Sequence, residues 1–295
     1  MKNKLRLYWK PLFAVMVWGA SFVATKIALS ELTPLTIVLS RLIMGVLLLA
    51  VIIFIKDGKF TIPPQVLKNI VLLALVASFH LWIQVTGLQF TTASNTGWII
   101  GFSPVFMAIL GVMFFHESLN FIRSCGIVIS LFGLLLLVSK GNFKNIGLIS
   151  NLGDLLVLAS AVTWSVYSAL NKKISLHYSP LLTIFYLFSF MSLFLIPFTI
   201  RPEGINSVIH LSLKGWLAIA FLGIFCSGIA YVLWAQALRE MDSANVGVFL
   251  YFEPFVTVFT AWIILGENIT FLTILSGIII TLGVVFVNRK AGASG

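Results

Sequence analysis

Two ionisable side chains of opposite charge, Arg41 and Glu253, lie deep within apolar segments of the sequence. Arg41 follows Pro34 by seven residues, which is about 10 Å into a helix that begins at this proline. Glu253 lies in the middle of another apolar run, directly before Pro254. A buried guanidinium can bind an anion or a carboxylate, and a buried carboxylate can bind an amine or carry a coupling proton. Both can also be internal clamps, Arg41 on backbone carbonyls and Glu253 across helices, and the sequence leaves both alternatives open.

Other side chains in apolar segments could complete a binding pocket around these charges. His80 is a second candidate for a proton site, with a packing role as the alternative. Deep aromatic side chains can stack on a planar or cationic ligand, and polar ones can fix its orientation. Contacts between helices or with lipid are the alternative for each of them. The pocket candidates of these two kinds are Trp18, Ser21, Trp82, Gln84, Trp164, Tyr231 and Tyr251.

Pro104 and Pro254 lie near the middle of two apolar segments, where glycines are also frequent. A proline in a helix removes one backbone hydrogen bond and bends the helix at low cost. We expect both to be kinks that serve as hinges, or static kinks that shape the wall of a cavity. In either role, these two segments are expected to line the same path.

The elements that must position these residues are membrane-spanning helices. The chain is 60% hydrophobic and only 9% charged, with a mean hydropathy of +1.08, whereas soluble domains are about a quarter charged. Apolar stretches long enough to span a bilayer fall near residues 12–30, 35–55, 70–89, 95–115, 121–139, 153–172, 180–198, 215–237, 244–265 and 270–287. We therefore predict an all-α membrane protein with ten transmembrane helices, because strands of a barrel would be short and alternating.

The chain also repeats itself at an offset of 150 residues. Residues Asn95, Gly97, Phe102, Pro104, Glu117, Phe121, Ile129 and Gly133 recur as Asn245, Gly247, Phe252, Pro254, Glu267, Phe271, Ile279 and Gly283. We predict two five-helix repeats, at residues 10–140 and 150–288. Five spans is an odd number, so the second repeat enters the membrane from the opposite side and the fold is inverted, as in many secondary transporters (5+5).

The basic residues divide unequally between the two sides of this topology. Thirteen Lys and Arg residues fall on the side of the two termini and five on the other side. The positive-inside rule therefore predicts cytoplasmic N- and C-termini. The orientation of the chain in the membrane explains the excess of basic residues behind the net charge of +10, so we expect no nucleic-acid partner.

Several short motifs follow one another in a fixed order: Trp18-Gly19-Ala20-Ser21-Phe22, Arg41, Pro104 with Glu117, Phe252-Glu253-Pro254 and Gly266-Glu267. Together with the ten spans and the duplication, they resemble the drug/metabolite transporter superfamily, specifically its EamA-type members, over residues 10–288. The resemblance implies a ten-helix transporter of the inner or plasma membrane whose central cavity is formed by both halves. Members often export amino acids or related metabolites.

Matched residues near the segment ends suggest structural tasks. Glu117 and Glu267 close equivalent spans and are expected to hold a loop or to pair with Arg123. The fifth and tenth spans carry small residues spaced for close approach of two backbones, which suggests helix packing or a homodimer contact.

The leading hypothesis is a secondary transporter that exports an amino acid or a related amphipathic metabolite by alternating access, with a proton carried by Glu253 or His80. One alternative is an importer of an organic cation such as choline, with an aromatic wall and Glu253 as the counter-charge. A membrane-embedded enzyme or scaffold acting on lipid is the alternative from another class. The sequence contains no Walker loop, metal-ligand run or nucleophile elbow, so we expect no enzyme, no cofactor and no metal.

Overall fold

The computed structural model describes residues 2–56, 58–115, 121–141, 151–175, 178–241, 246 and 248–288. The regular elements of these residues are all helical. In chain order they are α1 (Lys2–Ala28), α2 (Pro34–Lys56), α3 (Pro64–Gln89), α4 (Ala93–Ile100), α5 (Ser103–Phe115), α6 (Phe121–Val138), α7 (Leu152–Ser175), α8 (Pro180–Thr199), α9 (Pro202–Ile209), α10 (Leu213–Ala220), η2 (Phe221–Ile229), α11 (Ala230–Glu240), η3 (Val248–Phe252), α13 (Glu253–Leu265) and α14 (Phe271–Asn288).

These helices account for the ten predicted spans. Among the described residues, six uninterrupted helical stretches are long and apolar enough to cross a membrane, and three shorter apolar helices accompany them. The predicted fourth span is divided into α4 and α5, and α10, η2 and α11 form one continuous span. One predicted connection, residues 199–214, contains the short helix α9, which starts at Pro202. The fold class predicted from the sequence is confirmed.

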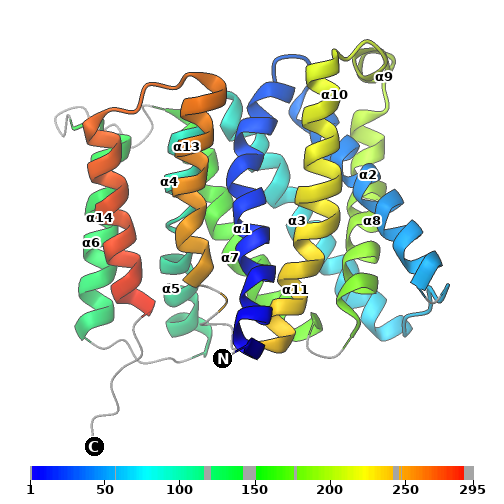
Figure 1. Ribbon diagram of the computed structural model, residues 1–295, viewed down its shortest axis with the longest axis horizontal. Coiled ribbons are helices and arrows are strands. Elements are labelled where there is room, and N and C mark those ends of the chain that lie inside the picture. Colours follow the sequence, from blue (N-terminus) through cyan, green and yellow to red (C-terminus); the bar gives the residue numbers. More distant parts are fainter. Residues whose placement is uncertain are drawn as a thin grey trace, which may run out of the picture.

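The two halves run in opposite senses, as Figure 1 shows. In the view of this figure, α6 rises where α14 descends, and the α4–α5 segment descends where α13 rises. The start of α1 and the end of α14 lie at the same end of the bundle, which is the lower end in Figure 1. We call this the terminal end, and the other the opposite end.

The helices pack through small residues inside and expose large apolar ones outside. A Cβ atom at Gly126 of α6 would lie 2.6 Å from the backbone nitrogen of Val287 on α14, so these two backbones touch. The small residues of the fifth and tenth spans thus pack against each other within one chain. Large apolar side chains exposed around the bundle fit a lipid surface, among them Leu47, Phe54, Leu72, Phe79, Leu193, Phe259 and Trp262.

Two spans are interrupted at positions related by the 150-residue offset. The first interruption, at Gly101 and Phe102, separates α4 from α5, and the second is the change from the 3₁₀ segment η3 to α13. Pro104 and Pro254 each occupy the second residue of the helix that follows. A proline in the first helical turn breaks no hydrogen bond of its own helix, so each proline fits the position directly after the interruption of its span.

Candidate functional site

Helices from both halves converge on one buried cavity in the middle of the bundle. Its volume is about 40 Å³, which holds a few water molecules but no amino acid. It is lined by Trp18, Ser21 and Phe22 of α1, Arg41 of α2, His80, Leu81 and Gln84 of α3, Ile100 of α4, Trp164 of α7, Tyr231 of α11 and Glu253 of α13. Eight of the ten residues proposed from the sequence for substrate or proton binding therefore surround one space.

The α2 helix supplies the positive charge of the cavity. Arg41 is only 4% exposed, and its Nε donates a hydrogen bond of 2.9 Å to Oγ of Ser227. Close packing of α2 on η2 allows this bond, because a Cβ atom at Gly223 would lie 2.5 Å from Cβ of Met44. The η2 segment is a π-helix, at whose end the amide of Ala230 bonds to the carbonyl of Phe225, five residues back. Wide helices of this kind are frequent at functional sites.

The α13 helix supplies the acidic side chain of the cavity. Glu253 is 7% exposed and is the first residue of α13, where the helix dipole favours a carboxylate. Among the described residues its carboxyl group has no hydrogen bond and no ion pair, Arg41 included. Its position depends on Gly19 of α1, where a Cβ atom would lie 2.8 Å from the Glu253 carbonyl oxygen. The cavity thus holds one basic and one acidic side chain that form no ion pair with each other.

Aromatic side chains form one wall of the cavity. The Trp18 ring lies edge-on to Trp164 and Tyr231, with centroids 5.7 and 5.2 Å apart, and Tyr167 stacks on Trp164. Trp18 is fixed further by its Nε1, which donates a hydrogen bond of 3.0 Å to the carbonyl of Cys226. Such a wall offers ring faces and edges to a ligand without adding a formal charge.

His80 has its orientation fixed by the helix opposite. Its Nδ1 lies 2.9 Å from the carbonyl oxygen of Ser160 on α7, and the ring is 5.3 Å from that of Trp164. A carbonyl oxygen can only accept, so Nδ1 carries the hydrogen. The other ring nitrogen, Nε2, is then the hydrogen-bond acceptor of the neutral ring.

Hydrogen bonds close the bundle at the opposite end. Nζ of Lys26 donates to the carbonyl oxygens of Leu88, at 2.8 Å, and Thr91, at 2.6 Å, at the end of α3. The Glu267 carboxylate accepts from the backbone nitrogens of Ala93, at 2.8 Å, and Ser94, at 3.1 Å, and so caps the start of α4. This is the structural task expected for Glu267. The corresponding expectation for Glu117 lies outside the described residues.

A polar hollow of about 850 Å³ opens above this closure, and Lys26 and Glu267 are part of its lining. On α1, Lys26 follows Phe22 of the central cavity by four residues, a helix rise of about 6 Å. The layer that separates the hollow from the cavity is therefore about one helical turn thick.

Two of the proposed pocket residues lie elsewhere. Trp82 is 40% exposed on the outer side of α3 and contacts the ring of Phe79. The Tyr251 hydroxyl donates to the carbonyl oxygen of Val284 on α14. Sequence reasoning in turn missed Ser227, because a serine in an apolar helix is common and its partner Arg41 is 186 residues away.

The two interrupted spans differ chemically at the cavity. The residue that corresponds to Glu253 at the 150-residue offset is Ser103. Ser103 is buried, and its hydroxyl donates to the carbonyl oxygen of Ile100 in the same segment. Only one of the two matched helix starts therefore carries an ionisable group.

Apolar helices in two oppositely oriented halves, closed around a charged cavity, define a multi-pass membrane transporter. The sequence profile of the EamA-like transporter family matches the chain twice, at residues 8–139 and 151–289, so the chain belongs to this family. The resemblance read from the motifs is confirmed.

Relatives of similar length support this assignment. An uncharacterized transporter of Archaeoglobus fulgidus is 31% identical, with 94% of this chain and 95% of that protein covered. The uncharacterized transporter YoaV of Bacillus subtilis is 26% identical over 91% of this chain and 92% of its own. A probable terminal-alkyne amino-acid exporter of Streptantibioticus cattleyicolor is 23% identical over 96% and 93%. A solved crystal structure that covers 95% of this chain and 96% of its own matches the fold with a TM-score of 0.66 at 17% identity.

Proposed function

We propose that the chain is a secondary transporter that exports an amino acid or a closely related zwitterionic metabolite by alternating access. The observation that carries this proposal is that a basic and an acidic side chain, Arg41 and Glu253, line one buried cavity without an ion pair between them. A ligand carboxylate would bind the guanidinium, and a ligand ammonium would bind the Glu253 carboxylate. The relative described as a probable amino-acid exporter is consistent with this cargo.

The small volume of the cavity supports a mechanism in which the helices around it move, and not a pocket of fixed shape. A space of about 40 Å³ must expand to admit an amino acid, so the helices around it must separate. The hydrogen bonds of Lys26 and Glu267 hold the opposite end shut in this structure. We propose that this closure breaks when the site opens to that side, while the two repeats, residues 10–140 and 150–288, rock against each other around Pro104 and Pro254.

The basic residues support one orientation in the membrane. Helix ends that lie at the terminal end carry or adjoin Lys10, Lys56, Lys59, Lys68, Arg123 and Arg239, and those at the opposite end carry or adjoin Lys26, Lys140, Arg201 and Lys214. We propose that the terminal end faces the cytoplasm of the cell in the inner or plasma membrane. The hollow beside Lys26 and Glu267 would then be the outer exit, and a proton would enter there to reach Glu253 or His80.

A set of matched ligands tests the proposal in liposomes that contain only this protein. An apolar amino acid is compared with the amine that lacks its carboxylate and the acid that lacks its amine. We expect labelled amino acid to cross, and each truncated ligand to compete at least tenfold more weakly, because one charge of the site is left unpaired. The absence of flux above protein-free liposomes, or truncated ligands that both compete as strongly as the amino acid, would refute it.

The same experiment decides the second candidate, an importer of an organic cation such as choline. The aromatic wall of Trp18, Trp164 and Tyr231 beside Glu253 favours this candidate, because quaternary ammonium groups bind such walls. The Arg41 guanidinium on the same cavity opposes it. Competition by choline that exceeds competition by the amino acid would make an organic cation the cargo in place of the amino acid.

A further inference from the structure

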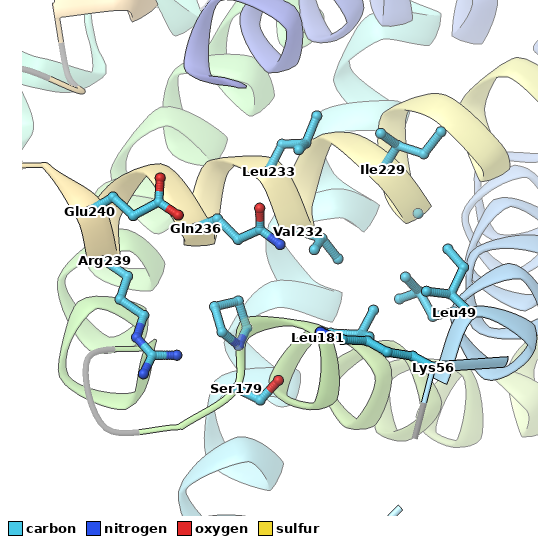
Figure 2. A pocket seen from close by; sticks show the side chains of 13 residues that line it. Leu49, Lys56, Ser179, Leu181, Ile229, Val232, Leu233, Gln236, Arg239 and Glu240 are labelled. Carbon is cyan, nitrogen blue, oxygen red and sulfur yellow. The ribbon is translucent and has the colours of Figure 1, made fainter. Parts of the chain in front are cut away.

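A second built groove lies at the terminal end, away from the central cavity. Helices α2 and α11 both pack on α8 and leave between them a groove of about 620 Å³. Figure 2 shows its residues, with Gln236 and Arg239 projecting from α11 toward the start of α8 and Leu49 on α2 at the far side. Neither the charges nor the aromatic wall of the central cavity belong to its lining.

The groove has an apolar interior and a basic mouth. Its interior consists of aliphatic side chains: Leu49, Ile52, Leu181, Ile229, Val232 and Leu233. Its mouth carries the exposed side chains of Lys56, the last residue of α2, and Arg239, near the end of α11. No hydrogen bond or ion pair engages either of them among the described residues.

The acidic residue of the groove does not cancel these charges. The carboxylate of Glu240 is held by Nζ of Lys10, with both oxygens at 2.6 Å. Figure 2 shows the Glu240 side chain on the other side of α11 from Arg239. The α8 helix also begins at the groove, at Pro180, and the hydroxyl of Ser179 before it caps no amide. The positive end of the α8 dipole therefore adds to the two cations.

The level of the groove in the membrane points to its occupant. Helix α2 ends at this level, α8 begins and α11 ends, so basic groups lie at the membrane surface and aliphatic ones toward the hydrocarbon core. A soluble anion would match only the mouth, and a neutral lipid only the interior. We propose that the groove binds an anionic phospholipid, with its headgroup phosphate between Lys56 and Arg239 and one acyl chain along Leu49, Ile229 and Val232.

The charge of the mouth can be tested by thermal unfolding of the full chain in detergent. Phosphatidylglycerol and phosphatidylcholine with identical acyl chains are titrated against the protein. The double variant Lys56→Gln and Arg239→Gln is compared with Lys214→Gln and Arg201→Gln, which remove two exposed cations from the opposite end. We expect phosphatidylglycerol to bind the first variant about thirtyfold more weakly than the wild type, and the control variant unchanged. Thirtyfold corresponds to about 2 kcal/mol, as expected for two basic residues near an anionic lipid.

Two further measurements separate lipid from other occupants. Glycerol phosphate, which has the anion without the chains, is expected to give no stabilisation. The variant Leu233→Phe, which fills the groove without a change of charge, is expected to weaken binding as well. Equal effects of the two lipids, stabilisation by glycerol phosphate alone, or unchanged binding by the Lys56 and Arg239 double variant would overturn the proposal. Flux is not measured, so failure here leaves the proposed transport intact.

Discussion

Replacement of Glu253 by Gln is the most direct test of how the cavity recognises its cargo. The substitution keeps the size of the side chain and removes its charge. A hydrogen bond to a charged group contributes about 1.5–3 kcal/mol, so we expect the amino acid to bind about tenfold to 150-fold more weakly. The Glu253 carboxyl has no partner among the described residues, so the thermal stability of the protein should stay close to that of the wild type.

A matched ligand pair makes this prediction specific. In Glu253→Gln, removal of the amine from the ligand should have little further effect, because the group that bound it is already gone. In Arg41→Gln, the ligand amine should still matter and the carboxylate should not. Apparent affinities from competition against labelled amino acid in liposomes give all of these values, and the pairs form a double-mutant cycle. The variant Ser227→Ala, which removes the partner of Arg41, should fall between wild type and Arg41→Gln.

One pattern of results would refute the reasoning. Glu253→Gln and Arg41→Gln could each weaken binding of the amino acid, the amine and the acid by the same factor. In that case the two residues hold the helices together and do not recognise the charged groups of the ligand. A large drop in melting temperature for Glu253→Gln would point to the same conclusion.

Three further predictions concern the frame around the cavity. Gly19→Ala should destabilise the protein by about 1–3 kcal/mol, because the added methyl would lie 2.8 Å from backbone of α13; Met16→Ala, on the exposed side of the same helix, is the control in thermal unfolding. Glu267→Gln weakens the cap of α4 and should cost about 0.5–2 kcal/mol of stability. It should also speed the reaction of thiol reagents with a cysteine introduced in the hollow beside Lys26 and Glu267, and unchanged labelling would show that this closure is no gate. Hydrogen bonds from Ser212 lower the pKa of Glu31 from its ordinary value of 4.5. The ionised carboxylate therefore stabilises the folded protein fully above pH 4.5, and this contribution is lost as the pH falls through the folded-state pKa. Glu31→Gln should remove that part of the acid sensitivity in melting curves.

The sequence predicted the membrane spans and the duplication well, because the signals for both are strong. Apolar runs of bilayer length can hardly be anything but spans, and matched Pro, Gly and Glu positions such as Pro104 and Pro254 disclose the duplication. The prolines were expected to be kinks, and in the structure both lie in the first turn of a helix, directly after the interruption of their span. Local pattern cannot tell these two outcomes apart, because a proline suits the first turn of a helix as well as a bend.

Which of the candidate residues line the cavity depends on the helix face that each occupies and on contacts between residues far apart in the sequence. His80 and Gln84 are four residues apart and share a face of α3, whereas Trp82 is two residues from each and points to the other side. This periodicity alone could have separated Trp82 from the other candidates. The sequence carries no such signal for the hydrogen bonds of Lys26. Their acceptors are backbone carbonyls more than 60 residues away, and every residue has a backbone carbonyl whatever its side chain.

The presence of a carboxyl on only one of the two interrupted spans has a thermodynamic consequence. Halves with identical side chains would make the inward-open and outward-open forms equal in free energy by symmetry. Glu253 has only a serine, Ser103, as its counterpart, so any change in the charge of this one group shifts the balance between the two forms in a single sense. Under the proposed alternating access, the direction of net movement would then depend on which compartment supplies the proton or ligand that neutralises the carboxyl, and the arrangement of the helices would not set it.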